Sequence, residues 1–566
     1  MIATTLRPAR NLFLQAQVDL FCLLTSSALP HAPRRRHTRP LAWALSALLA
    51  TTWPATAPLA QVRLPALGDS VSEEFDILAE RRLGERIMRD IRRDPAYLDD
   101  PVLLEYLHGL FNPLLSAARS RGEIGQDLDS TYSFETFLVG ERPVNAFALP
   151  GGYIGVYLGL IALTGSSDEL ASVLAHELSH VTQRHIARSM VNNQRQSMAA
   201  LAGFLVGVLA ASRSSSPDVA QAVVMGSQAA LAQGQLSFSR DMEREADRIG
   251  IDLLGSAGYS PSGMAGMFEK LEGNSRLNDN NQYPYLRSHP LTIERISEAR
   301  LRLREAATPP PKTSAVPHAL MQARSKVLMD RNDQALLRMQ GLAAPGAPMA
   351  DLPRLAALYA GGLASIFLRD FDQAEKILDQ GAALVAARFA GEPEAKRQFA
   401  LLRVAMVGER GGAAGRMVPA LNNAFAPLAH DRSRPVLLAR AQAALARQRS
   451  GDPAAAESLR ESTEALQTWV AEHRRDALAW QTLAQCAEPL GLRLRSLRAG
   501  AEAAAANGDI LGAVDRLRAA RQIALDTRSD DFVEVSVIQA RLRELERDRR
   551  QLLAEMRGER NPEDVP

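Results

Sequence analysis

The sequence predicts a mostly helical protein of the α+β class, in which a domain with one small β-hairpin sheet precedes an all-helical domain. Aromatic residues make up only 5% of the 566 residues, and the second half is rich in the helix formers Ala, Leu and Arg. Residues typical of strands gather in a single stretch, 132–157. A proline-rich segment, 308–317, separates this part from a long series of helical patterns.

The composition is that of a globular chain and gives no reason to expect nucleic acid as a partner. Hydrophobic residues amount to 46% and charged residues to 23%, which excludes a membrane-embedded or disordered protein. The net charge is +2, of which the first sixty residues contribute +5 (six Arg, one Asp), so the remainder carries about −3. A net charge this close to zero does not indicate the basic surface that nucleic-acid binding requires.

Residues 1–60 have the pattern of a secretory signal peptide with a long basic extension. Three arginines at 34–36 precede the apolar run 41–49, and small residues and prolines follow at 55–60. The apolar run is shorter than the ~20 residues that span a bilayer. We expect cleavage after Ala60 (Ala57 is the other candidate) and export, which fits a bacterial periplasmic protein at least as well as a eukaryotic secreted one.

Only one of the two cysteines, Cys486, would remain after this cleavage, so no intramolecular disulfide is expected. The mature chain is expected to divide into a domain over 61–307, the linker 308–317 and a helical domain over 318–566. A first membrane anchor around 11–24 is an alternative for the early residues, against which the polar Asp19 argues.

Two helices and a three-stranded β-region are expected before the first candidate site. Charge and apolar spacing predict helices, and aromatic and β-branched runs predict strands, the last two joined as a hairpin by a Pro-Gly-Gly turn. The helices are expected at 73–92 and 100–118, the strands at 132–139, 144–149 and 153–157, and the turn at 150–152.

The next helix carries the pattern His-Glu-x-x-His. Ser166 and Glu169 form a capping box before an apolar run with helical spacing. His176 and His180 are four residues apart, so both imidazoles lie on one face and can reach one metal ion. Glu177 then lies beside the metal, where it can take the proton of a bound water. This pattern is typical of zinc peptidases.

A later charged segment supplies candidates for the third ligand that a catalytic zinc site needs. Glu243 and Asp247 share a helix face, so Glu243 can bind the metal while Asp247 hydrogen-bonds the outer nitrogen of a ligating histidine. Glu245 is the rival ligand, but it points about 160° away from Glu243 on a helix.

These motifs resemble those of the gluzincin metallopeptidases related to HtpX and the CAAX prenyl proteases. The strings at 145–156, 180–185 and 245–250 are similar to a periplasmic branch of this group, which joins such a domain to a tetratricopeptide tail. The resemblance is strong over 61–303 and mainly architectural beyond it. It implies one Zn²⁺ per chain held by His176, His180 and Glu243.

The resemblance also implies the chemistry and the partners. Glu177 would be the general base, and Asp247 matches a position treated as catalytic, for which we favour an orienting role over proton donation. The expected function is a periplasmic zinc endopeptidase that cleaves misfolded or unassembled outer-membrane proteins, with a tail that contacts the outer-membrane assembly machinery. The alternative is a chaperone or scaffold with a latent protease site.

The hairpin and two further histidines allow more than one role. An extended substrate could add as a strand beside Asn145, Ala146 and Phe147, or the hairpin could be purely structural. His185, nine residues after His176, is expected on the far side of the same helix and in a structural role. His289, in a loop before a helix, is a candidate for an oxyanion stabiliser, for a latch on the metal, or for no role.

The helical domain has turns of similar composition at 369–372, 450–452 and 507–509. Their irregular spacing indicates degenerate tetratricopeptide-like repeats, with a plain helical bundle as the alternative. Two apolar stretches, 198–211 and 219–232, are expected to form a buried hairpin, or else a cover over the site or a surface that touches membrane or unfolded substrate.

Overall fold

The computed structural model describes residues 76–192, 239–277, 283–305, 314–346, 349–526 and 531–556. The expected signal peptide, the apolar stretches 198–211 and 219–232, and most of the linker lie outside these residues. Residues Asp69–Pro566 form one compact unit. None of the helices in the described part of the chain combines the length and apolar character of a membrane span.

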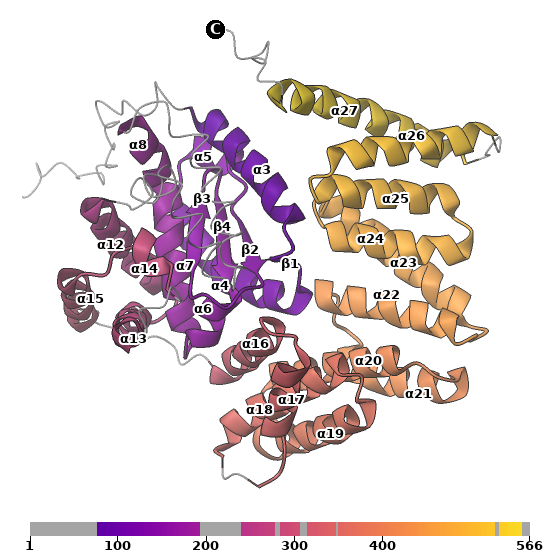
Figure 1. Cartoon of the computed structure of the whole chain (residues 1–566), viewed down its shortest axis with the longest axis horizontal. Coiled ribbons are helices and arrows are strands. Elements are labelled where there is room, and N and C mark those ends of the chain that lie inside the picture. Colours follow the sequence, from indigo (N-terminus) through magenta and orange to yellow (C-terminus); the bar gives the residue numbers. More distant parts are fainter. Residues whose placement is uncertain are drawn as a thin grey trace, which may run out of the picture. The chain divides into compact units, whose positions relative to one another are not determined.

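A four-stranded sheet forms the centre of the N-terminal region (Figure 1). Its order is β1 (Tyr97–Leu98), β2 (Glu135–Val139), β4 (Tyr153–Tyr157) and β3 (Ala146–Leu149). Strands β3 and β4 are the antiparallel hairpin that the sequence predicts, and β2 runs parallel to β4. Strand β1 was not predicted, because two residues are too short to show alternation.

The hairpin turn depends on glycine. Gly151 and Gly152 have φ of 78° and 89°, in the left-handed region that side chains strain to enter. The turn lies against α3 (Ile77–Arg93), whose Gly84 sits so close that an added Cβ would lie 1.9 Å from the carbonyl oxygen of Pro150. The glycines therefore hold the hairpin directly on this helix.

Helix α7 (Ser167–Thr182) begins at the predicted cap. The Ser166 hydroxyl accepts a hydrogen bond from the Glu169 amide at 3.2 Å, while the Glu169 carboxylate accepts from Gly165 at 2.6 Å. Helix α12 (Arg240–Ser256) packs on α7, and Gly250 permits the close approach, because an added Cβ there would meet the His176 amide nitrogen at 3.3 Å.

Seven more helices complete the described N-terminal region. They are α4 (Pro101–Ser120), α5 (Gln126–Thr131), α6 (Leu158–Leu163), α8 (His185–Asn192), α13 (Ser262–Leu277), α14 (Tyr285–Ser288) and α15 (Ile293–Glu305). Buried residues of α4, α7, α12 and α13 share one apolar core with the inner face of the sheet.

Every element that the structure describes in the C-terminal region is a helix, so the predicted fold class is confirmed (Figure 1). The turn predicted at 369–372 falls at the junction of α18 (Asp351–Phe367) and α19 (Phe371–Arg388), and Gly451 and Gly508 have positive φ at the other two turns. The α-helices are α16 (Ala315–Leu328), α17 (Asp333–Leu342), α18 (Asp351–Phe367), α19 (Phe371–Arg388), α20 (Pro393–Arg410), α21 (Ala414–Phe425), α22 (Arg434–Arg449), α23 (Ala455–Glu472), α24 (Ala477–Ala487), α25 (Arg493–Ala506), α26 (Ile510–Asp526) and α27 (Phe532–Met556).

Helix α16 begins at Ala315, three residues before the expected start of the helical domain. Ser314 caps it, and Pro317 falls in its first turn, where a proline costs no hydrogen bond. The helix packs against both α6 and α18. A single apolar core therefore runs from Val102 in α4 to Ala446 in α22.

Candidate metal centre

Helix α7 presents three buried polar side chains to one point. His176, Glu177 and His180 are 2%, 0% and 0% exposed. The Nε2 atoms of the two histidines lie 3.0 Å apart, as their four-residue spacing predicts. Burial lowers the pKa of His180 well below its ordinary value, so this imidazole is neutral and has a lone pair to offer.

Helix α12 adds two carboxylates on one face. Glu243 Oε1 lies 3.4 Å from His180 Nε2, and Glu243 Oε2 lies 3.5 Å from His176 Nε2. One turn later, Asp247 Oδ1 accepts from His176 Nδ1 at 2.9 Å. This bond keeps the proton on Nδ1 and leaves Nε2 open toward the centre. Capping of α12 by the Ser239 hydroxyl fixes where this face begins.

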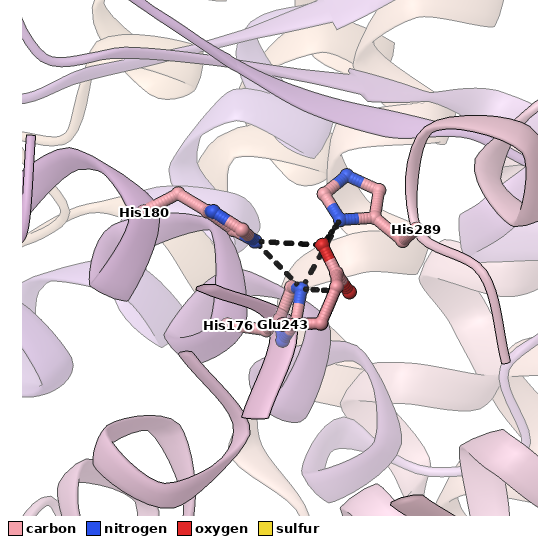
Figure 2. Close-up of side chains that lie close together, drawn as sticks. All are labelled: His176, His180, Glu243 and His289. Carbon is pink, nitrogen blue, oxygen red and sulfur yellow. Dashed lines mark hydrogen bonds and ion pairs between the residues drawn. The ribbon is translucent and has the colours of Figure 1, made fainter. Parts of the chain in front are cut away.

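His289 completes the cluster from the segment between α14 and α15. Its Nδ1 lies 3.2 Å from His176 Nε2 and 3.0 Å from Glu243 Oε1, and its ring stacks on Tyr285. Figure 2 shows the four side chains pointing at one another. The sequence left three roles open for His289, namely oxyanion stabiliser, latch on the metal, or none. Its place in this cluster favours one of the first two.

The four side chains have the spacing of a metal site. One ligand atom from each of His176, His180, Glu243 and His289 lies within 4.8 Å of the others. Ligands ~2.0–2.1 Å from a tetrahedral ion should be roughly 3.3 Å apart. The distances of 3.0–3.5 Å between the paired atoms agree with this value. The residues therefore fit a small ion with nitrogen and oxygen ligands.

Glu177 differs from the other buried carboxylates of the centre. Neither of its oxygens has a hydrogen-bond partner among the described residues, and Oε1 lies 3.5 Å from His289 Nε2. Buried polar atoms are nearly always bonded, to protein or to water. Its position beside the ligands suits a group whose partner is a water or a substrate atom.

Arg295 is a member of the centre that the sequence analysis missed. Its guanidinium binds Asp247 through Nε and Nη2 at 2.6 and 2.8 Å, and its Nη1 lies 2.7 Å from Glu243. Burial by itself would raise the pKa of Asp247, but Arg295 and His176 outweigh it and hold that pKa low. Arg295 is one of four arginines on α15, so no local signal distinguished it.

The structure corrects the expectation for His185. Helix α7 ends at Thr182, the chain reverses at Arg184 (φ 51°), and α8 begins at His185. His185 therefore does not continue the helix around its far side. Its Nδ1 lies 2.8 Å from His180 Nδ1, and its Nε2 lies 3.1 Å from Glu245 Oε2.

Glu245 belongs to this second contact and not to the ligand cluster. It pairs with His185 and with Arg188, at 3.1 and 3.0 Å. Among the described residues, the cluster with metal-ligand spacing contains Glu243 but not Glu245, in line with the opposite helix faces expected for them.

The expected substrate strand lies near the centre. Ala146 and Phe147 belong to β3, the last strand in the sheet order, and Asn145 precedes it. The Asn145 carbonyl accepts from Tyr157, and the Val144 carbonyl accepts from Tyr285 at 3.4 Å. The start of β3 is thus tied to the segment that carries His289.

Comparison with known proteins identifies the family. The model of peptidase family M48 matches residues 119–303, which include all four clustered residues and Arg295. A beta-barrel assembly-enhancing protease of Yersinia pestis is 30% identical over 470 residues, which are 81% of this chain and 87% of that protein. The chain belongs to the family of the beta-barrel assembly-enhancing proteases.

Other relatives align over shorter stretches. A Vibrio cholerae relative is 33% identical over 332 residues, 58% of this chain and 65% of that protein. The beta-barrel assembly-enhancing protease of Escherichia coli K12 is 35% identical over 239 residues, 42% of this chain and 47% of its own length. Family membership confirms the prediction of a metalloendopeptidase with a metal-binding cluster.

Proposed function

We propose that the chain is a periplasmic zinc endopeptidase that cleaves unfolded or unassembled outer-membrane proteins. The observation that carries the proposal is the cluster of His176, His180 and Glu243, with the spacing of a tetrahedral ion, around the unpartnered carboxylate of Glu177. These three ligands would hold one Zn²⁺. When bound, zinc would lower the pKa of a water toward ~7 and polarise a peptide carbonyl.

Glu177 is the proposed general base. Its free carboxylate oxygens can accept the proton of the attacking water and return it to the leaving amine. No other carboxylate of the centre is as suitable. Both oxygens of Asp247 are engaged by Arg295 and His176, so we assign it the orientation of His176 and not proton donation.

His289 is the proposed latch. Its Nδ1 stands where a fourth ligand would, so the segment between α14 and α15 must move before water or substrate can reach the metal. In a His289→Ala variant we expect cleavage to rise. A loss of cleavage with zinc retained would instead favour the oxyanion-stabilising role.

The substrate class rests on two supports. Strand β3 is outermost in the sheet order, so an extended chain added beside Asn145, Ala146 and Phe147 would be held by main-chain bonds that ignore sequence. The names of the Yersinia and Escherichia relatives describe enhancement of β-barrel assembly. We propose the same setting here, with residues 1–60 as signal peptide and residues 61–307 as peptidase domain.

The helical region over 318–566 is proposed to be tetratricopeptide-like and to contact the outer-membrane assembly machinery. A second candidate function follows, namely a chaperone or scaffold whose protease site is latent. The position of His289 among the ligand atoms favours it, because a four-ligand site is closed.

The test uses the chain from Gln61 with Glu177→Gln. Zinc content by metal analysis should stay at one per chain, while cleavage of an unfolded outer-membrane protein should stop. Persistent cleavage with zinc retained would refute the mechanism. Rescue of an outer-membrane assembly defect in cells by the same variant would establish the scaffold function as separate.

A further inference from the structure

We propose that His185 is a positioning residue for the metal ligand His180, with Glu245 as the charge behind it. This inference rests on the proposed zinc site and adds a group that orients one of its ligands. It concerns the contact His180–His185–Glu245, which passes from α7 through the start of α8 to α12.

The hydrogen bonds allow one arrangement of protons when His180 binds metal through Nε2. That nitrogen faces the cluster, so its lone pair is used and the ring proton must be on Nδ1. His180 Nδ1–H then donates to His185 Nδ1 at 2.8 Å, which must be unprotonated. His185 Nε2–H in turn donates to Glu245 Oε2 at 3.1 Å. The three side chains thus fix the tautomer and the ring plane of His180.

The environment of His185 supports a positioning role. Its side chain is fully buried, and its ring meets that of His180 edge to face, with 4.9 Å between centroids. The Arg188 guanidinium lies 3.0 Å from the Glu245 carboxylate and holds it in place beside His185. Each imidazole nitrogen of His185 therefore has a defined partner.

The backbone is strained to bring His185 there. Arg184 has φ of 51°, in the left-handed region that residues with a side chain rarely enter. A buried carboxylate on α3, Glu80, holds this turn by accepting from Arg184 Nε at 2.6 Å and from the Tyr132 hydroxyl at 2.5 Å. Strain that is held in place by its surroundings is a feature of functional sites.

The two ligand histidines are therefore supported differently. His176 donates directly to a carboxylate, Asp247, which is neutralised by Arg295. His180 donates to a neutral imidazole, and the carboxylate stands one residue further away. The geometry points to the same function, orientation of a ligand, achieved by two routes.

The experiment compares three variants of the mature chain. His185→Leu removes the acceptor and keeps the volume, whereas His185→Asn retains an acceptor near the Nδ1 position. His318→Leu is the matched control, because His318 is also buried and bonded through both nitrogens, to Tyr106 and to the Thr164 carbonyl, without contact with the ligands. Release of Zn²⁺ to excess chelator and the melting temperature of the metal-free protein are measured for each.

We expect His185→Leu to weaken zinc retention by about 10–100-fold, the range for lost partners of ligating histidines. His185→Asn should recover most of this loss, and His318→Leu should release zinc at the wild-type rate even if its melting temperature falls. Glu245→Gln lies at the partly exposed end of the contact, so it should also speed the release of zinc, but by less. This variant replaces His185→Leu in the test if His185→Leu does not fold.

Two results would overturn the inference while leaving the zinc site intact. One is wild-type release from both His185→Leu and Glu245→Gln. The other is equally fast release of zinc from His185→Leu, His185→Asn and His318→Leu, which would indicate that the role of His185 is purely structural. A wild-type chain that retains no zinc would refute the proposed function itself, and with it this inference.

Discussion

The N-terminal and C-terminal regions bury charged side chains in different ways. Around the metal centre, His176, His180, Glu243 and His289 converge on a volume the size of one ion, and neither oxygen of Glu177 has a hydrogen-bond partner among the described residues. In the helical region, carboxylates with little exposure pair directly with arginines. Glu534 accepts from Arg498, and Asp476 accepts from Arg434, at 2.7 Å in each case.

The difference shows that burial of a charge does not by itself indicate function. Glu534 is buried and its pKa is lowered, because Arg498 and Arg495 outweigh the effect of burial, so its charge is already compensated. Such a pair fixes the packing of α25 on α27. A convergent set of ligand atoms beside a carboxylate without hydrogen bonds is instead the arrangement expected of a functional site.

The strongest test of this comparison exchanges one carboxylate in each region. Glu177→Gln should lower cleavage by about 10²–10⁴-fold, the contribution of a general base, without lowering the free energy of unfolding. Glu534→Gln should leave cleavage unchanged and cost about 1–3 kcal/mol, because Arg498 loses its charged partner. Peptidase assays and urea denaturation of both variants check this. Equal destabilisation by the two changes would remove the distinction.

A second test breaks a buried pair between the regions. Arg324 on α16 binds both carboxylate oxygens of Asp100, the cap of α4, at 2.8 and 2.7 Å. Arg324→Leu should cost about 3–5 kcal/mol, because the buried Asp100 loses its cation. The control is Arg410→Ala, whose partners Asp372 and Glu375 are exposed, with an expected cost below about 1 kcal/mol. Similar midpoints in urea for the two variants would contradict the prediction.

Removal of the metal should affect the two regions unequally. A metal ion at a free concentration 100 times its dissociation constant stabilises the native state by about 2.7 kcal/mol. A chelator should abolish this stabilisation together with cleavage. Hydrogen exchange should then quicken in α7 and α12, which carry the ligands, and stay unchanged in α24–α27. Faster exchange throughout the helical region would show that the ion stabilises both regions.

Acid should weaken the paired charges of the helical region. Burial alone would raise the pKa of Asp476, but Arg434 outweighs it and the pKa is lowered. A lowered folded-state pKa contributes stability that is complete above the ordinary carboxyl value of ~3.9 and is lost as pH falls through the folded value. The urea concentration at the midpoint of unfolding should therefore fall as the pH is lowered below about 4. It should fall by less in Arg434→Leu. An equal drop in both proteins would exclude this pair as the source.

Much of the fold and of the site was predictable because it depends on periodicity within one element. The spacing of His176 and His180, and of Glu243 and Asp247, places each pair on one helix face wherever that helix packs. The glycine turn at 151–152 likewise predicts the hairpin, whereas β1 is too short to produce a pattern.

Arg295 and His185 could not be predicted, for a physical reason. Their contacts depend on how one element lies against another, which local spacing does not encode. His185 reaches His180 only because the chain reverses at Arg184, and Arg295 reaches Asp247 only because α15 packs near α12.

The sequence by itself determined that His176, Glu177 and His180 would share one helix, that Glu243 and Asp247 would share a face of another, and that helices would follow. The tertiary structure alone decided that His289 lies beside His176, that Arg295 binds Asp247, and that His185 contacts His180. Helical periodicity holds only within one helix, whereas two of these contacts join groups 113 and 48 residues apart that packing brings together, and the third crosses the chain reversal at Arg184.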